Sequence, residues 1–301
     1  MPGSASGAEN PHRVAVTGAS GFIGGALHRR LEQEGAEVHA VSRRREEAER
    51  WWQLDVCTPG ALDELLREVR PAVLFHLAGE TSASRDLDLV QPTFAANVAA
   101  TVNVLSSVAA HSPSTRVVTA GSLEEPTGGE PASSPYALSK AATAAYGRLF
   151  HELYETRVVH LRVFMVYGPG QAAVAKLVPY VTLALLRGEP AVLASGRRRV
   201  DWVYVEDVAS AFLAAGSAGP AADGRSFDVG SGELASVRDV AEEIAAIVGE
   251  GELRFGERHE RPNEQERVAD PQPAASVLGW RATTPLADGL RRTVDWYRRQ
   301  H

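Results

Sequence analysis

The sequence has very little cysteine, no long uninterrupted apolar stretch and no excess of positive charge. Its 301 residues include a single cysteine, Cys57, which excludes an internal disulfide and a zinc site built from several cysteines, so no metal is predicted. No window approaches the ~20 apolar residues that a membrane-spanning helix needs, so no membrane partner is expected. With 31 basic and 38 acidic side chains the net charge is −7, which argues against nucleic acid as a partner.

The first ten residues lack both the basic start and the apolar stretch of a signal peptide. We therefore expect residues 1–11 to be disordered and the protein to be soluble and cytoplasmic. The overall content of 44% hydrophobic and 23% charged residues is that of an ordinary globular protein.

Short apolar runs alternate with helical patterns in the first half of the chain. Strands are expected over 13–17, 36–42, 72–77, 116–120 and 157–163, and helices over 22–34, 61–70, 95–110 and 135–154. This alternation predicts right-handed crossovers and a parallel sheet that is covered on both faces, which is a doubly wound α/β fold.

The regular alternation of expected strands and helices ends at Gly168-Pro169-Gly170. Helices are expected over 176–187, 237–248 and 286–299, short strands over 201–205 and 226–229, and mostly loop over 250–273. A smaller C-terminal lobe is therefore expected beside the sheet.

A glycine-rich turn follows the first expected strand and opens the first expected helix. Its pattern is G-x-x-G-x-x-G, in which glycines allow a tight turn and a close approach to a pyrophosphate, while the helix N-terminus offers free N–H groups. A plain structural turn is the alternative. The predicted dinucleotide contacts here are Gly18, Ser20, Gly21, Phe22, Ile23 and Gly24.

The end of the second strand bears on the choice between NAD and NADP. An acidic residue there would bind the ribose hydroxyls of NAD, but this chain has Ser42, Arg43 and Arg44. A hydroxyl and guanidinium groups suit a 2′-phosphate, so NADP(H) is favoured, with NAD and a merely solvated basic loop as alternatives. Asp55, followed by Val56, stands where such folds place an acid against the adenine.

Tyr136 and Lys140 are four residues apart on one expected helix, so their side chains share a face. A neighbouring ammonium group stabilises a phenolate, and we expect Lys140 to lower the pKa of Tyr136. Ser122 ends the preceding strand and is expected to point into the ligand crevice. Asn97 is expected either to hold a carbonyl or water near Lys140 or to face solvent.

These residues, taken in order, resemble the extended short-chain dehydrogenase/reductases, the NAD-dependent epimerase/dehydratase family. The matching features are the glycine turn, Asp55, His76-Leu77-Ala78-Gly79, Asn97, Ser122, Tyr136 with Lys140, Leu161-Arg162, Tyr167-Gly168-Pro169-Gly170, Asp201 to Val208, Arg261-Pro262 and Leu278-Gly279-Trp280. The resemblance covers about residues 13–297.

The resemblance implies a Rossmann domain over 12–169 and 200–231, and a substrate-binding lobe over 170–199 and 232–301. It also implies a homodimer formed through helices around 90–110 and 136–154. Tyr136 would exchange the proton at the sugar oxygen, Lys140 would bind the nicotinamide ribose, and Ser122 would bond the reacting carbonyl. Leu77, Ala78 and Gly79 would complete the cofactor site.

The residues after Ser122 bear on the reaction. Sugar 4,6-dehydratases of this family carry an Asp-Glu pair there, whereas this chain has Leu123 and Glu124, and a leucine cannot act as an acid. The run Ser122 to Glu125 resembles the Ser-x-Glu-Glu of 4-keto-6-deoxysugar reductases. The leading hypothesis is therefore an NADPH-dependent reductase of a nucleotide-bound 4-keto-6-deoxyhexose.

Three alternatives stay open: an NAD-dependent nucleotide-sugar 4-epimerase, a non-catalytic NADP-binding protein, and a ketone or aldehyde reductase that acts on a substrate without a nucleotide. Met165 and Val200 replace the asparagine and arginine that the family often has, and Met165 stands where that asparagine contacts the sugar nucleotide. The predicted substrate contacts are Glu124, Lys176, Arg199 and Arg261.

Overall fold

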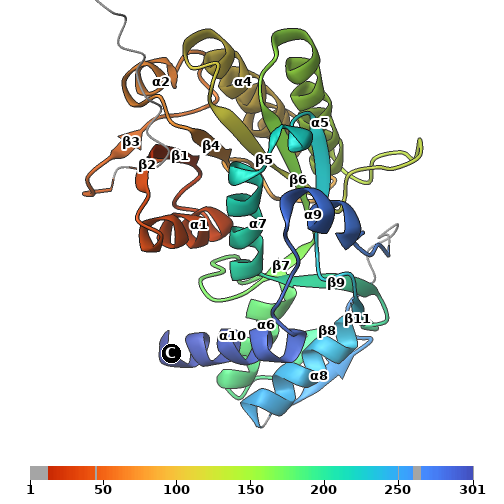
Figure 1. Cartoon of the computed structure of the whole chain (residues 1–301). Helices are drawn as coiled ribbons and strands as arrows, with labels where there is room; N and C mark the ends of the chain where they lie inside the picture. Colours follow the sequence, from red (N-terminus) through yellow and green to blue (C-terminus); the bar gives the residue numbers. More distant parts are fainter. Residues whose placement is uncertain (1–12, 45, 250, 260–265, 301) are drawn as a thin grey trace, which may run out of the picture.

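A computed structural model of the chain describes residues 13–44, 46–249, 251–259 and 266–300; the expectation for residues 1–11 and the one for Arg261 lie outside the described residues. Seven parallel strands form one large sheet in the order β10-β6-β5-β4-β1-β2-β3 (Figure 1). They are β1 (Arg13–Thr17), β2 (Glu37–Ser42), β3 (Trp51–Gln53), β4 (Val73–His76), β5 (Arg116–Ser122), β6 (Val158–Val163) and β10 (Arg225–Val229).

Helices cover both faces of this sheet, and each face has its own buried core. On one face lie α1 (Phe22–Gln33), α7 (Val205–Ser217) and α9 (Pro271–Leu278). On the other lie α2 (Asp63–Val69), α4 (Ala100–His111) and α5 (Pro135–Tyr154). The strands are apolar along their length because both of their faces are covered. The predicted doubly wound α/β fold is confirmed.

The strand order reverses between β1 and β4, which are neighbours in the centre of the sheet. From this point the chain leaves β1 toward one edge and β4 toward the other. The loops that follow the two strands therefore diverge and leave a crevice at the carboxyl ends, where sheets of this kind bind ligands. The glycine turn 18–24 and residues 77–79 both lie at this point.

The remaining strands form two small sheets at one end of the molecule (Figure 1). β11 (Leu234–Ser236), β9 (Arg199–Tyr204) and β7 (Met165–Tyr167) form one, and β12 (Leu253–Phe255) pairs with β8 (Ala191–Leu193) in the other. They share a third core with α6 (Leu177–Leu186), α8 (Val237–Val248) and α10 (Leu286–Gln300). From the sequence, strand β9 is assigned to the same domain as the large sheet. In the structure β9 is the middle strand of the three-stranded sheet instead.

A continuous helical run, Leu87–His111, meets the length and hydropathy requirements of a membrane span, contrary to the expectation from the sequence. It consists of two short helices, η1 (Leu87–Leu89) and α3 (Val90–Thr93), a π-helical stretch η2 (Phe94–Ala99), and α4. Half of its apolar window is buried inside the protein, and the run packs against α2 and α5. Its alanine and valine content is that of a helix within a core.

Some short elements differ from the sequence-based expectation. Residues 250–273 are not all loop, because β12 and the start of α9 lie there. The side chain of Asp270 accepts the N–H of Gln272, and Pro271 occupies the first helical position, so α9 begins with two standard start signals. The three-residue strands β3, β7, β8, β11 and β12 have no periodicity of their own and form because a neighbouring strand pairs with them. The turn η3 (Pro220–Ala222) completes the elements.

Candidate active site

The glycine turn between β1 and α1 has a backbone that only glycine adopts easily. Gly18 has a φ of +72°, and a Cβ placed on it would lie 2.6 Å from the backbone nitrogen of Ala78. The turn after β1 therefore packs directly on the loop after β4. This close contact brings the two predicted halves of the cofactor site together.

Helix α1 begins at this turn with no side chain bound to its first N–H groups. Gly21 is its N-cap and makes no side-chain hydrogen bond, and the first turn holds no acidic residue. Gly24 packs so tightly that a Cβ would lie 2.1 Å from the carbonyl oxygen of Gly18. A glycine cradle with exposed Ser20 and Gly21 at an uncapped helix N-terminus fits the pyrophosphate of a dinucleotide. Phe22 and Ile23 form the first turn of this helix and are half-buried.

The end of β2 carries no acidic residue, because Ser42 is its last position. The Ser42 hydroxyl donates to the carbonyl of Arg44 at 2.7 Å and accepts from Trp51 Nε1 at 3.2 Å. These bonds hold the turn that carries the exposed side chains of Arg43 and Arg44. Two guanidinium groups are thus offered to solvent beside the crevice.

Asp55 and Val56 lie in the loop after β3, at the same carboxyl edge of the large sheet as the end of β2. The Asp55 carboxylate accepts the backbone N–H of Cys57 at 3.0 Å, and the Val56 carbonyl accepts from Asn103 Nδ2 at 3.1 Å. Asp55 is exposed and Val56 is buried. A side chain of α4 therefore fixes this loop against the large sheet.

Tyr136 and Lys140 lie in the first turns of α5, and Ser122 ends β5. Ser134 caps α5 by accepting the N–H of Ala137 at 3.1 Å, and Pro135 follows it at the first helical position. Lys140 Nζ donates to the carbonyl of Ala120 at 2.8 Å, and it lies 5.7 Å from the centre of the Tyr136 ring. The helix start is therefore tied to the end of β5.

The pKa of the Tyr136 phenol is raised to about 12, above all by burial. A hydrogen bond with Ser122 acts in the opposite direction, and the charges of Glu124, Glu125 and Glu80 raise the pKa further. The expected lowering of this pKa by the lysine one turn away is wrong for the protein alone, because burial has the largest effect and the carboxylate charges add to it.

Lys140 and His76 are buried together beneath the crevice. Burial lowers the pKa of Lys140 to about 8, against the opposing charge of Glu125. Burial, and then the charge of Lys140, lower the pKa of His76 to about 3. His76 is therefore neutral near pH 7, and its Nδ1 lies 2.8 Å from Thr17 Oγ1 at the end of β1.

Asn97 lies in the π-helical stretch η2 and is buried. Its side chain accepts the N–H of Glu80 at 2.8 Å and donates to the carbonyl of Glu80 at 3.2 Å and to Ser139 Oγ at 2.8 Å. Asn97 thus clamps the loop after β4 to helix α5. Of the two roles expected for it, the holding of a carbonyl is observed. A π-helical stretch often accompanies a functional residue, because it redirects one side chain.

The predicted substrate contacts are spread over both parts of the protein. Glu124 is half-buried near Tyr136, whereas Lys176, just before α6, and Arg199, at the start of β9, are exposed on the smaller lobe. Leu123 is buried in the large core, so the position of the dehydratase acid holds an apolar side chain that faces away from solvent.

A polar cluster that was not predicted from the sequence lies between the backbone of Ser122 and strand β6. It consists of Thr119, Glu125, His160 and Arg162, and Arg267 donates to the backbone carbonyls of Leu123 and Glu125. A histidine and an arginine at alternate positions of the otherwise apolar strand β6 were the available signal.

Comparisons with known proteins identify the family of the chain. The model of the NAD dependent epimerase/dehydratase family matches residues 14–230. The UDP-glucose 4-epimerase of Mycolicibacterium smegmatis is 34% identical, over 95% of this chain and 98% of that protein. The probable dTDP-glucose 4,6-dehydratase of Sinorhizobium fredii is 28% identical, over 95% of this chain and 92% of that protein.

Solved structures show the same fold over almost the whole chain. UDP-glucose 4-epimerase of Thermus thermophilus, in complex with NAD, superimposes with a TM-score of 0.84 at 27% identity, covering 95% of this chain and 99% of that one. UDP-glucose 4-epimerase of Thermotoga maritima, with UDP-glucose, gives a TM-score of 0.87 at 24% identity, covering 96% and 99%.

Two adjacent glycines of α1 allow a matched test of the cradle. Gly24→Ala should abolish dinucleotide binding and lower the melting temperature, because its Cβ has no space beside Gly18. Gly25→Ala should bind normally and gain up to about 1 kcal/mol of stability, because its Cβ would meet other atoms only at 3.5 Å or more. Calorimetric titration and thermal denaturation measure both; equal binding by the two variants would contradict the assignment.

Proposed function

We propose that this chain, which belongs to the NAD dependent epimerase/dehydratase family, transfers hydride at C4 of a nucleotide-bound hexose. The observation that carries the proposal is the joint placement of Ser122, Tyr136 and Lys140. The three residues meet at the carboxyl end of the large sheet, where the glycine turn and the clamped loop after β4 also lie.

Each residue has a role that its surroundings support. The protonated Tyr136 phenol would give its proton to the sugar oxygen, and its high pKa keeps the proton in place until an acceptor arrives. Ser122 would donate a hydrogen bond to the same oxygen, and Lys140 would hold the cofactor ribose and stabilise the phenolate that forms. The bound nicotinamide supplies or accepts the hydride.

For the finer reaction, we favour reduction of a 4-keto-6-deoxyhexose by NADPH. The end of β2 supports this choice, because it lacks the carboxylate that would repel a 2′-phosphate and offers the guanidinium groups of Arg43 and Arg44. Leu123 also argues against dehydration, because it is buried and carries no acid.

A second candidate, an NAD-dependent nucleotide-sugar 4-epimerase, is supported by a different observation. The relative that is 34% identical over 98% of its length is a UDP-glucose 4-epimerase, and a solved neighbour of the same name holds NAD. The same three residues would serve that reaction, in which the hydride returns to the opposite face of C4.

The substrate would be held between the two parts of the protein. Glu124, near Tyr136, is placed to bind sugar hydroxyls, and the cations Lys176, Arg199 and Arg261 are proposed to bind the diphosphate. The single cysteine agrees with a proposed cytoplasmic location.

We also propose a homodimer formed through two neighbouring helices. An apolar face is exposed on them, with Leu87 83% and Phe94 55% exposed on the first, and Leu138 60% and Leu153 63% exposed on α5. Each pair lies along one face, because its residues recur at helical spacing. A second copy of the chain, with the same face, would bury these side chains.

Tyr136→Phe should lower turnover by about 10²- to 10⁴-fold, because the proton donor is lost, while dinucleotide affinity stays the same. Tyr154→Phe, at the exposed end of α5, is the matched control and should keep full turnover. The assay uses a nucleotide-bound 4-keto-6-deoxyhexose with NADPH, and UDP-glucose with NAD. Substantial residual turnover by the Tyr136→Phe variant would contradict the role of Tyr136 as proton donor.

Replacing both Arg43 and Arg44 by serine should weaken NADPH binding by about 10- to 100-fold, the range for lost charged hydrogen bonds, and leave NADH binding unchanged. Arg29→Ser together with Arg30→Ser, which removes two exposed arginines of α1, controls for the change in net charge. Fluorescence titration of the wild type and the two variants with NADPH and with NADH gives six dissociation constants. If the wild type purifies with stoichiometric bound NAD and does not bind NADPH, the 4-epimerase becomes the favoured function.

Leu149→Asp together with Leu153→Asp should convert a dimer into a monomer, because two charges would be buried in the proposed interface. Val174→Asp, which places a charge on another exposed apolar side chain, should leave the assembly unchanged. Sedimentation velocity measures all three proteins. A wild type that sediments as a monomer at micromolar concentration would overturn the proposed dimer.

A further inference from the structure

The loop after β5 turns back so that the carboxylate of Glu125 lies under the backbone of Ser122. This side chain is only 4% exposed. It accepts three N–H groups: the backbone N–H of Ser122 at 2.8 Å, His160 Nε2 at 3.0 Å and Arg162 Nε at 3.4 Å. A buried carboxylate with this many donors is a stable anion, and the pKa of Glu125 is lowered to about 2 by these contacts against the effect of burial.

The strand makes room for this carboxylate with a glycine. A Cβ on Gly121 would lie 2.2 Å from both Glu125 Oε1 and His160 Nε2. Gly121 has no positive φ, so backbone conformation does not require a glycine there. Since glycine weakens the interior of a strand, its presence is explained by the two polar groups that occupy the space of its side chain.

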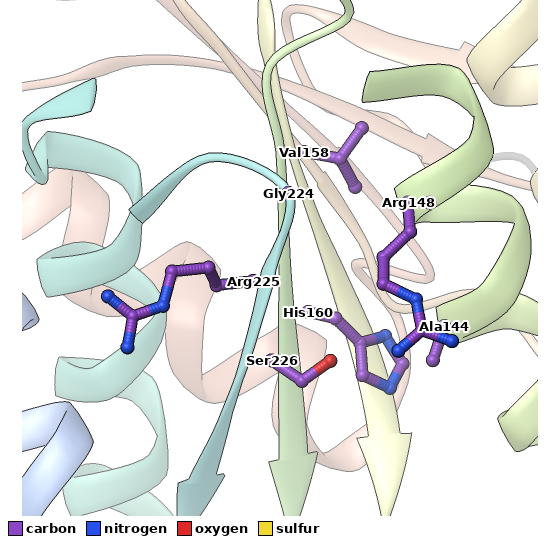
Figure 2. A pocket seen from close by; sticks show the side chains of 8 residues that line it. Ala144, Arg148, Val158, His160, Gly224, Arg225 and Ser226 are labelled. Atoms are coloured by element: carbon purple, nitrogen blue, oxygen red, sulfur yellow. The ribbon is translucent and has the colours of Figure 1, made fainter. Parts of the chain in front are cut away.

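His160 connects this carboxylate to the centre of the sheet. Its Nδ1 lies 2.8 Å from Thr119 Oγ1, two positions before Gly121 on β5. The imidazole also borders a shallow depression between α5, β6 and β10, which Arg148 and Ser226 line as well (Figure 2). The ring is thus held by two hydrogen bonds and cannot turn without breaking both.

Two arginines extend the cluster beyond β6. Arg162 binds Asp228 on β10, and Asp228 accepts the backbone N–H of Asp270 at 3.1 Å just before α9. Arg267 donates to the carbonyls of Leu123 and Glu125 and forms an ion pair with Glu130 at 3.0 Å. The loop that carries Ser122 is therefore held from β6, from β10 and from the C-terminal segment.

We propose that Glu125 is a positioning residue, which fixes the backbone of Ser122 and so holds its hydroxyl against the Tyr136 phenol. The proposal rests on the proposed function, because Glu125 can position reacting groups only if Ser122 and Tyr136 have the roles proposed above. It assigns Glu125 no contact with the substrate. It goes beyond that function by naming a buried ion cluster as the support of the reacting groups.

A merely structural carboxylate would affect folding but not the titration of the reacting groups. Glu125 is close enough to Tyr136 and Lys140 to raise the pKa of both, together with Glu124 and Glu80 near the phenol. Removing its charge while keeping its shape is therefore expected to lower the pKa of Tyr136. The readout that distinguishes positioning from simple stability is a loss of kcat at unchanged KM, with partial rescue by a residue that can still donate to this carboxylate.

The test compares Glu125→Gln with Glu152→Gln, an exposed position on α5, in the assay described for Tyr136. Glu125→Gln should lower kcat by about 10- to 100-fold, the range for a displaced catalytic group, with KM and cofactor affinity nearly unchanged. The limb of its pH–rate profile that reports Tyr136 should move to lower pH. Glu152→Gln should match the wild type.

Should Glu125→Gln fail to fold, His160→Leu and His160→Gln give the same comparison, since only glutamine can still donate to Glu125. His160→Leu should then lose kcat and His160→Gln should recover part of it. Wild-type kcat in either Glu125→Gln or His160→Leu would overturn the proposal. The Tyr136→Phe variant separates the two proposals in the same assay. If it is inactive while Glu125→Gln behaves like the wild type, only the positioning role is contradicted. If Tyr136→Phe is active, the proposed function is contradicted.

Discussion

The ammonium group of Lys140 donates a hydrogen bond of 2.8 Å to the carbonyl of Ala120, and this bond ties the first turns of α5 to the last residues of β5. Because Tyr136 lies one turn before Lys140 and Ser122 lies two residues after Ala120, the bond also sets the distance between phenol and hydroxyl. Helix α5 can hold this position because its start is capped by Ser134. The arrangement of the reacting groups depends on this junction between one helix and one strand.

Parallel strands bring their following loops to one edge of the sheet, but they do not hold those loops still. Three of the loops at this edge are fixed by side-chain hydrogen bonds, two from helices and one from within the loop itself. Asn97 clamps the backbone of Glu80, Asn103 holds the carbonyl of Val56, and Glu125 holds the N–H of Ser122. Asn97 and Glu125 are buried and Asn103 is half-buried, so the loss of these hydrogen bonds would leave unsatisfied polar groups. A rigid polar frame thus surrounds an otherwise apolar core.

The sequence was sufficient to predict the doubly wound sheet, the glycine turn and the pairing of Tyr136 with Lys140, because these depend on local spacing and strand–helix alternation. It was not sufficient for the short strands β3, β7, β8 and β12, whose formation depends on a partner far away in the chain. The raised pKa of Tyr136 also escaped prediction. It depends on burial and on Glu80, which is brought close only by the fold. The Glu125–His160 pair joins residues 35 positions apart, and the polar residues of β6 gave no indication of which partner His160 would have.

We propose that hydride moves between a nicotinamide and C4 of a nucleotide-bound hexose under the control of Ser122, Tyr136 and Lys140. This transfer can be followed directly with NADPH that carries deuterium at C4 of its nicotinamide, by NMR after incubation with a nucleotide-bound 4-keto-6-deoxyhexose. We expect one deuterium at C4 of the sugar and an equal amount of NADP⁺. A product without deuterium at that carbon, or no reaction with that sugar and none with UDP-glucose, would contradict it.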